Sequence, residues 1–226
     1  MIRIRFHGRG GHGTKTASRV VGTAAFLSGY QAQDSPYYGA ERRGAAVVAY
    51  TRVDEAPILE RGAIDQPDLI VVADETLLDA ADAQVLSGQS TASAIFVNAQ
   101  DAGPLKENFG IAPPVVAVDL TTLTLEILGS ASALSSGLAA AAAAMSGIIV
   151  QEHFVAALRE EFAQLGLERE ETAKNVQVGV RVFEQISPVE IHAPSTGMEI
   201  EMATVSYENP LLSTPSVLHA GNAEAR

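Results

Sequence analysis

The chain begins with a pattern that predicts a strand, a glycine-rich loop and a helix. Apolar residues alternate with arginine from Ile2 to Phe6, which is the period of a strand with one buried face. Residues 7–13 follow without a break and contain four glycines, so they form a loop. From Thr14 onward, apolar residues recur every three or four positions, which predicts a helix that ends at Gly29.

The same two periods continue along the chain and predict the fold class. The run Asp68 to Ala73 is almost continuously apolar, as in a strand that is buried on both faces of a parallel sheet. Strands alternate with helices, which indicates one three-layer α/β domain with a mostly parallel sheet. Beyond the first elements, the pattern predicts strands at about 30–33, 45–53, 68–73, 94–97 and 115–118, and helices at about 75–86, 120–128, 134–149, 152–165 and 168–185.

The C-terminal part of the chain has a different character. We place the α/β domain at residues 1–187 and an extended tail at residues 188–226, because four prolines interrupt the tail and no periodicity is sustained there. A segment of this kind is either disordered or ordered by wrapping a partner subunit. Its scattered apolar residues, which include Ile200, Val205 and Leu211, favour the partner-wrapping alternative.

Composition limits the chemistry that the chain can perform by itself. Of its 226 residues 47% are hydrophobic, and none is cysteine. The lack of thiols excludes disulfides, thiolate zinc sites, cysteine nucleophiles and iron–sulfur clusters held by this chain. The five histidines show no metal-ligand spacing, so we predict no metal site. Any iron–sulfur centre must therefore lie on another chain.

The net charge of −12 is unevenly distributed. Residues 1–61 contain nine basic and five acidic side chains, whereas residues 62–226 contain six and 22. This acidity argues against nucleic acid as the main partner, and we expect an anionic ligand at the basic N-terminal part. No signal peptide is visible, and the longest apolar stretch, residues 138–150, is too short for a membrane span. We therefore expect a cytoplasmic protein without membrane contact.

Residues 8–13 match the pattern G-x-G-x-x-G between the predicted strand and helix. Glycines permit close backbone approach, so the loop N–H groups and the helix N-terminus can face a phosphate or a carboxylate, and Arg9 and Lys15 add positive charge. The alternative is a tight turn in which the glycines serve only geometry. Asp34 stands where a dinucleotide fold places its ribose-binding acid, but a loop follows it where such a fold needs a helix. The expected contact residues are Gly8, Arg9, Gly10, Gly11, His12, Gly13 and Thr14.

A second loop, Tyr37 to Gly44, contains an acid and two arginines between glycines. Arginine makes bidentate contacts with carboxylates and phosphates, so Arg42 or Arg43 is a candidate ligand contact. Equally, Glu41 is a candidate ion-pair partner that holds the loop in place. The sequence leaves both roles open.

The remaining polar candidates do not form a catalytic group. His12 is a candidate acid, base or hydrogen-bond donor, but no paired carboxylate or nucleophile is close to it in sequence. Asp74 follows a core strand, where α/β proteins often place functional residues, yet helix capping explains it equally well. We therefore predict no catalytic residue in this chain.

Four stretches of the sequence resemble the gamma subunit, or gamma domain, of the 2-oxoacid:acceptor oxidoreductases. These are thiamine-diphosphate enzymes that act on pyruvate, 2-oxoglutarate, 2-oxoisovalerate and aromatic 2-oxoacids. The resemblance covers about residues 2–186, and the two loops at this spacing are specific to the family. The family usually has glutamine at the position of His12, and the tail beyond Pro188 exceeds the usual end of the domain. The four stretches are HGRGGHG with Thr16 in the next helix, SPYYGAERRGAAV, PDLIVVAD, and a late helix with Lys174-Asn175.

The resemblance implies a multisubunit enzyme that oxidatively decarboxylates a 2-oxoacid to an acyl-CoA. Alpha, beta and ferredoxin-like delta subunits would hold thiamine diphosphate, Mg²⁺ and iron–sulfur clusters. This chain would have no self-contained active site; it would cover the active site and contact coenzyme A (CoA). The resemblance places the CoA contacts at residues 8–14 and Arg43, with Arg9 and Arg43 as the charged contacts. Tyr38, Glu41 and Arg42 would support the substrate loop.

Two other functions stay open on the sequence alone. One is an independent dinucleotide-binding, NAD-linked oxidoreductase domain, which would bind its cofactor as an isolated chain. The other is a structural adaptor that contacts no ligand. The sequence also leaves open which 2-oxoacid is used and whether ferredoxin or NAD is the electron acceptor. An NAD-linked enzyme would need FAD on an additional flavoprotein subunit.

Overall fold

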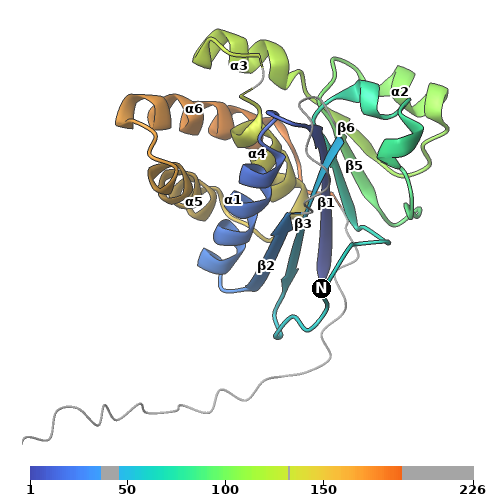
Figure 1. Cartoon of the computed structure of the whole chain (residues 1–226), viewed down its shortest axis with the longest axis horizontal. Coiled ribbons are helices and arrows are strands. Elements are labelled where there is room, and N and C mark those ends of the chain that lie inside the picture. The colour runs from blue at the N-terminus through green and yellow to red at the C-terminus, as the bar shows by residue number, and fades with distance from the viewer. Residues whose placement is uncertain (37–45, 132, 190–226) are drawn as a thin grey trace, which may run out of the picture. The chain divides into compact units, whose positions relative to one another are not determined.

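The structure, a computed structural model, describes residues 1–36, 46–131 and 133–189. These residues contain a six-stranded sheet in the order β2-β3-β1-β4-β5-β6 (Figure 1). Strands β1, β4, β5 and β6 are parallel, whereas β3 is antiparallel to both of its neighbours. The predicted α/β class with a mostly parallel sheet is therefore confirmed. The strands are β1 (Ile2–Arg9), β2 (Gln31–Pro36), β3 (Ala46–Asp54), β4 (Leu69–Val72), β5 (Ala94–Val97) and β6 (Val115–Ala117).

Four helices cover one face of the sheet. Helices α1 (Thr14–Leu27) and α4 (Ser135–Ser146) pack against the strands, and α5 (Gln151–Gln164) and α6 (Arg169–Gln185) lie outside them (Figure 1). Alternate residues of β1, among them Ile4 and Phe6, are fully buried in this core, which explains the alternation in the sequence. Helix α4 is buried on all sides because its alanines allow close approach of the surrounding elements.

The opposite face of the sheet carries a smaller apolar cluster. Helix α2 (Ala102–Phe109) and two 3₁₀ turns, η1 (Glu75–Leu77) and η2 (Ala81–Ala83), pack their apolar side chains against β4 and β5. Helix α3 (Leu120–Leu128) contacts α6 at the upper end of the molecule (Figure 1). Helices and turns on both faces of one sheet make the predicted three layers.

In this smaller layer, one helix prediction is wrong and one helix lies where none was predicted. The predicted helix at 75–86 is replaced by η1 and η2, since Gln84 adopts a positive φ of 45° and Ala80 is extended, so no helix can continue through them. Helix α2 was not predicted. Gly103 and Pro104 lower its propensity, but both lie in the first turn, where proline is tolerated and Asp101 caps the helix by accepting a hydrogen bond from the Gly103 N–H.

The described part of the predicted tail remains attached to the domain. The Val189 N–H donates to the carbonyl oxygen of Met145 at 3.2 Å, at the end of α4. The tail from residue 190 onward and the loop 37–45, with the predicted contacts Tyr38, Glu41, Arg42 and Arg43, lie outside the described residues. Within the described ranges, no helix combines the length and the apolar character that crossing a membrane requires.

Candidate functional site

The carboxyl ends of β1, β4 and β5 meet the N-terminus of α1 at one edge of the sheet. Because these strands are parallel and adjacent, the residues that follow them lie side by side. A cavity of about 280 Å³ opens there, in the place where open α/β sheets bind their ligands. Its polar lining consists of His12, Asp74, Glu75, Thr76, Asn98 and Thr121.

Glycine is required at two positions of the loop between β1 and α1. Gly13 is the N-cap of α1 with a φ of 72°, and a Cβ there would lie 2.8 Å from the Cβ of Ser135, the first residue of α4. A Cβ on Gly8 would lie 2.5 Å from the Thr14 Cγ2. No side chain caps α1, so its first N–H groups are not satisfied by a capping side chain. The loop therefore brings the N-termini of two helices close together.

Arg9 connects the ends of β1 and β4. Its Nε donates to the Asp74 Oδ2 at 2.8 Å, and its Nη2 donates to the Thr76 Oγ1 at 2.9 Å. Burial raises the pKa of the Asp74 carboxyl, but hydrogen bonds from Thr76 and Arg9 outweigh this effect and lower the pKa overall. Asp74 therefore remains a carboxylate and holds the Arg9 guanidinium at the cavity. Asp74 also caps η1 through the Thr76 N–H, so the capping alternative is confirmed, whereas a functional role of this residue stays a prediction.

His12 closes the loop onto the end of β1. Its backbone N–H donates to the Arg9 carbonyl oxygen at 3.0 Å, and its Nδ1 accepts a hydrogen bond from the Arg9 N–H at 3.3 Å. Burial lowers the pKa of the imidazole and the Arg9 charge lowers it further, while Asp74 opposes this change. The ring is therefore neutral at pH 7 and lies in the wall of the cavity.

Asn98 fixes the opposite wall of the cavity. Its amide nitrogen donates to the Ala73 carbonyl oxygen and to the Thr121 Oγ1, both at 3.0 Å, and its Oδ1 accepts from the Leu120 N–H at 2.8 Å. The side chain thus links the end of β4 to the start of α3. We did not predict Asn98, Thr76 or Thr121; a polar residue directly after an apolar strand was the available signal for Asn98.

Comparison with known proteins identifies the family. The family model described as pyruvate ferredoxin/flavodoxin oxidoreductase matches residues 3–185. The chain belongs to this family. A similar relative is the pyruvate/ketoisovalerate oxidoreductases common subunit gamma of Pyrococcus furiosus, 39% identical over 187 residues that cover 81% of this chain and all of the relative. Within the family, the chain is a gamma subunit of a 2-oxoacid:ferredoxin oxidoreductase complex. The predicted resemblance is confirmed.

Solved structures support the same fold. The crystal structure of the pyruvate oxidoreductase subunit PORC of Thermotoga maritima has a TM-score of 0.68 at 28% identity and covers 81% of this chain and 95% of that one. The 2-oxoglutarate:ferredoxin oxidoreductase of Magnetococcus marinus, at a TM-score of 0.66 and 13% identity, shares the fold over 84% of this chain and 32% of its own. The gamma-subunit fold thus also occurs as part of a longer polypeptide.

In this gamma subunit, the glycine loop lies where the sequence pattern places it, whereas Asp34 does not lie where a dinucleotide fold needs its acidic residue. Residues 8–14 lie together at the carboxyl edge of the sheet, as the pattern predicts. Asp34 does not join them. It pairs in register with Thr51 of β3, and Thr51 pairs with Ile4 of β1. The antiparallel strand β3 therefore separates Asp34 from β1, and the side chain lies far from the end of that strand. In a dinucleotide fold the second strand lies directly beside the first.

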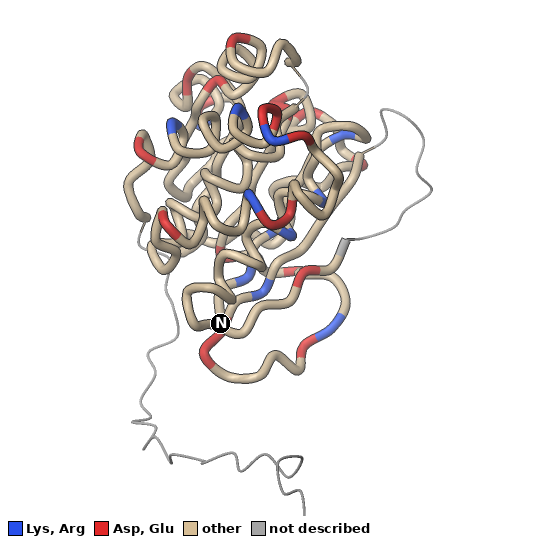
Figure 2. The backbone as a smooth tube through the Cα atoms, turned by 90° about the vertical axis from the view of Figure 1, so that its left-hand side faces the viewer, with Lys and Arg blue, Asp and Glu red and all other residues tan. Residues whose placement is uncertain are grey.

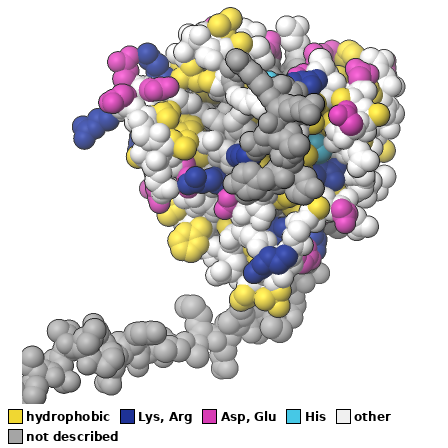
Figure 3. All heavy atoms as spheres, viewed as in Figure 1, with side chains coloured by type: hydrophobic (Ala, Val, Ile, Leu, Met, Phe, Trp, Pro, Cys, Tyr) yellow, Lys and Arg dark blue, Asp and Glu magenta, His cyan; other side chains and the backbone are white. Residues whose placement is uncertain are grey.

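The basic N-terminal part of the gamma subunit does not form one electropositive patch in the described residues. On the face drawn in Figure 3, basic and acidic side chains lie interspersed, and the backbone tube in Figure 2 likewise has basic and acidic positions near one another. Arg19 pairs with Glu161 at 2.6 Å, and Arg5 donates to the carbonyl oxygens of Ile64 and Val85. Hydrogen bonds or ion pairs to acidic or carbonyl groups involve Arg3, Arg5, Arg9, Arg19, Arg52 and Arg61. The excess of basic residues in the sequence therefore has a largely structural explanation.

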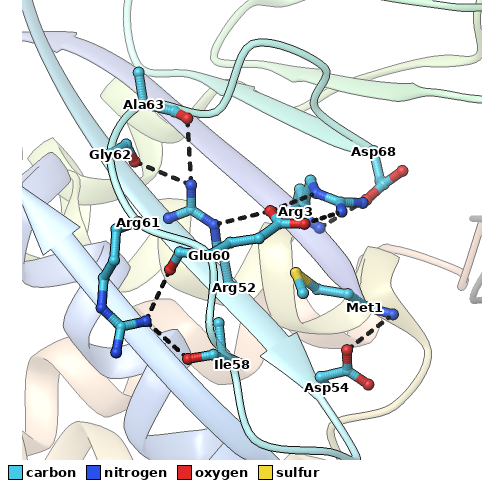
Figure 4. A network of polar contacts seen from close by, with 10 residues as sticks. All are labelled: Met1, Arg3, Arg52, Asp54, Ile58, Glu60, Arg61, Gly62, Ala63 and Asp68. Carbon is cyan, nitrogen blue, oxygen red and sulfur yellow. Dashed lines mark hydrogen bonds and ion pairs between the residues drawn. The ribbon is translucent and has the colours of Figure 1, made fainter.

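A second polar cluster lies at the opposite, amino end of β1 (Figure 4). Arg3 binds Glu60 through two hydrogen bonds of 2.6 and 3.2 Å, and Arg52 donates to the carbonyl oxygens of Gly62 and Ala63 at 3.0 and 3.2 Å. A cavity of about 690 Å³ adjoins this cluster. Although this cavity is larger than the one beside His12, its arginines are already bonded to the segment that follows β3. We therefore assign a structural role to this cluster.

Proposed function

We propose that this gamma subunit covers the active site of the complex and binds part of coenzyme A through the glycine loop and the adjacent cavity. The complex would oxidatively decarboxylate a 2-oxoacid to an acyl-CoA. The observation that supports the proposal is the cavity at the carboxyl ends of β1, β4 and β5, next to a helix N-terminus without a side-chain cap. Such an edge suits a ligand that combines anionic and polar neutral groups.

The chain's own residues favour a binding role over catalysis. Asp74 is bonded to Arg9 and Thr76, and His12 has no nucleophile or free carboxylate as a hydrogen-bond partner in the described residues. Iron–sulfur clusters need thiolates, and this chain has no cysteine. The described residues also contain no group of three acidic or histidine side chains suited to a metal ion. We therefore place thiamine diphosphate, Mg²⁺ and the clusters on alpha, beta and delta subunits.

What is known of two related proteins agrees with this proposal. The Magnetococcus enzyme is described with 2-oxoglutarate, coenzyme A and succinyl-CoA bound. The Pyrococcus furiosus subunit is described as common to pyruvate and ketoisovalerate oxidoreductases. By analogy, we propose that the partner subunits choose the 2-oxoacid here and that ferredoxin accepts the electrons. The gamma subunit would then exclude water from a reactive intermediate on the partner chains.

Arg9→Ala in the assembled complex tests the proposal. Loss of the guanidinium at the cavity edge should raise the KM for CoA about tenfold, as expected for one charge-assisted hydrogen bond, and should leave the KM for the 2-oxoacid unchanged. Arg61→Ala is the matched control, because Arg61 donates to carbonyl oxygens far from the glycine loop, at the other end of the sheet. An unchanged CoA dependence in Arg9→Ala, with the complex intact, would remove this edge from the CoA site.

Titration of NAD into the isolated chain tests the independent dinucleotide-binding alternative. We expect no binding, because β3 lies between β1 and the strand that contains Asp34. Saturable NAD binding would favour that alternative over a CoA-contacting cover. A structural adaptor would instead leave CoA kinetics unchanged in every glycine-loop variant.

A further inference from the structure

Three of the six large apolar side chains that are exposed in the described residues lie where two helices meet. Phe26 is 67% exposed and Val150 54%, and Leu27 is exposed as well. Phe26 and Leu27 end α1, and Val150 is the N-cap of α5. The Ser28 hydroxyl is 3.0 Å from the Nδ1 of His153, so the C-terminus of α1 lies beside the N-terminus of α5. We call Phe26, Leu27 and Val150 the apolar junction.

The fold of the chain does not need the most exposed of these side chains. The core face of α1 consists of smaller residues, of which Ala17, Val20 and Ala24 are fully buried. Phe26 contributes through its backbone, because its carbonyl oxygen accepts the Gly29 N–H. Figure 3 shows a hydrophobic side chain protruding at the lower left, where α1 ends in the same view of Figure 1. Neighbouring exposed apolar side chains, one of them aromatic, are typical of a protein–protein contact surface.

Three carboxylates flank the apolar junction, each on a different element. Glu152 is exposed in the first turn of α5, and Glu184 of α6 accepts a hydrogen bond from the first residue of α5 at 3.2 Å. Asp34 of β2 lies one helical turn along α1, since a Cβ on Gly22 would be 3.8 Å from the Asp34 Cβ. Carboxylates repel a second copy of the same surface and attract Lys and Arg side chains.

We infer that the apolar junction binds another subunit of the oxidoreductase complex, through an apolar patch of that subunit bordered by Lys or Arg. An apolar centre with charges at its rim is the usual arrangement of such a contact. The junction lies at the opposite end of α1 from the glycine loop, about 20 Å away for a helix of 14 residues. The contact is therefore separate from the proposed CoA site and does not rest on it.

Phe26→Ser in the assembled complex tests the contact. Native mass spectrometry of the purified complex over a dilution series gives the Kd of the gamma subunit for its partner subunits. We expect Phe26→Ser to raise this Kd about thirtyfold, as for an aromatic residue at the centre of an interface. Leu165→Ser is the matched control, since Leu165 is also exposed but ends α5, about 20 Å from Val150. An unchanged Kd for Phe26→Ser, or an equal rise in both variants, would overturn the inference.

Glu152→Gln tests the charge of the partner surface. Removal of one flanking carboxylate should raise the same Kd about threefold and make it less sensitive to salt, because one attraction to a basic side chain is lost. A lower Kd in this variant would mean that the partner surface is acidic, and would overturn the inference.

The isolated chain separates a partner subunit from other occupants of the junction. Phe26→Ser should leave its urea midpoint unchanged, since the side chain is exposed. A lower midpoint would mean that the chain covers the junction itself, and a dimer that Phe26→Ser dissociates would mean a second copy; either result would overturn the inference. Arg9→Ala should leave the Kd of the gamma subunit unchanged, so this inference and the proposed function can fail separately.

Discussion

An arginine lies at each end of β1, and the two arginines have different roles. At the amino end, Arg52 of the neighbouring strand is only 2% exposed, and its guanidinium is bonded to backbone carbonyl oxygens. At the carboxyl end, the Arg9 side chain is 33% exposed and is oriented by Asp74 beside a cavity. A buried arginine bonded to the backbone stabilises a loop, whereas a half-buried arginine held by a carboxylate orders a surface that a ligand can reach. Burial and partners, and not charge alone, separate structure from function here.

We expect the largest effect on stability from a substitution of Arg52, the buried arginine at the amino end. Arg52→Leu leaves the carbonyl oxygens of Gly62 and Ala63 without their donor and should lower the free energy of unfolding of the purified chain by about 3 kcal/mol. Urea unfolding measures this change. The exposed Arg61→Ala should change stability by less than about 0.5 kcal/mol. A complex assembled with Arg52→Leu should keep its KM for CoA. A raised KM would show that the amino end also affects CoA binding.

His7 lies between the two ends of β1, on the same face as Arg5 and Arg9. We expect it to make the largest contribution to the loss of stability at acid pH. It is 3% exposed, and neither ring nitrogen has a partner in the described part of the chain. Burial, assisted by the Arg5 charge, lowers its pKa from 6.5 to about 3. The unfolded chain therefore takes up this proton below pH 6.5 and the folded chain does not, so stability falls as pH falls through this window.

The slope for one such group is roughly 1.4 kcal/mol per pH unit. Between pH 6.5 and 4.5, the loss of stability should therefore be about 2.3 kcal/mol smaller in His7→Leu than in the unsubstituted chain, because the unfolded chain is already half protonated at pH 6.5. Urea unfolding at the two pH values measures the difference. Equal pH dependence in both chains would show that the folded protein accommodates a charged His7.

Gly13→Ala tests the close approach at the carboxyl end. The substitution puts alanine at a positive φ and its Cβ 2.8 Å from Ser135, which together should cost about 2 kcal/mol of stability. Gly11→Ala is the matched control, since its φ is also positive, at 101°, but a Cβ there meets nothing within 4 Å. Thermal unfolding of both variants separates backbone strain from packing. If the two variants are equally destabilised, the contact between the loop and α4 is not required.

Asp74→Asn should have the smallest effect on stability and a selective effect on binding. The ion pair with Arg9 is partly solvated, so its loss should cost less than about 1 kcal/mol. Arg9 would lose its orientation, and the KM for CoA should rise about threefold. Asp54→Asn, which weakens the pair with the N-terminal amine at the other end of the sheet, is the control. A similar rise in both variants would mean that the effect is not local.

Local patterns predicted most of the elements. The alternation in β1, the apolar run of β4 and the alanines of α4 reflect burial that each segment requires by itself, so a single sequence reveals them. The prediction of one helix from Glu75 to Leu86 is wrong because the apolar residues have helical spacing, whereas the extended backbone of Ala80 and the positive φ of Gln84 interrupt the segment.

The sequence by itself determined the fold class, the glycine loop between strand and helix, the absence of thiol chemistry and the resemblance to the gamma subunits, because these depend on neighbouring residues and on composition. Only the tertiary structure decided which charged side chains pair with one another. Arg9 meets Asp74 across 65 positions of the chain, and the insertion of β3 between β1 and β2 moves Asp34 away from the loop. Such pairings follow from strand order, which depends on the packing of the whole sheet and is not encoded within any one segment.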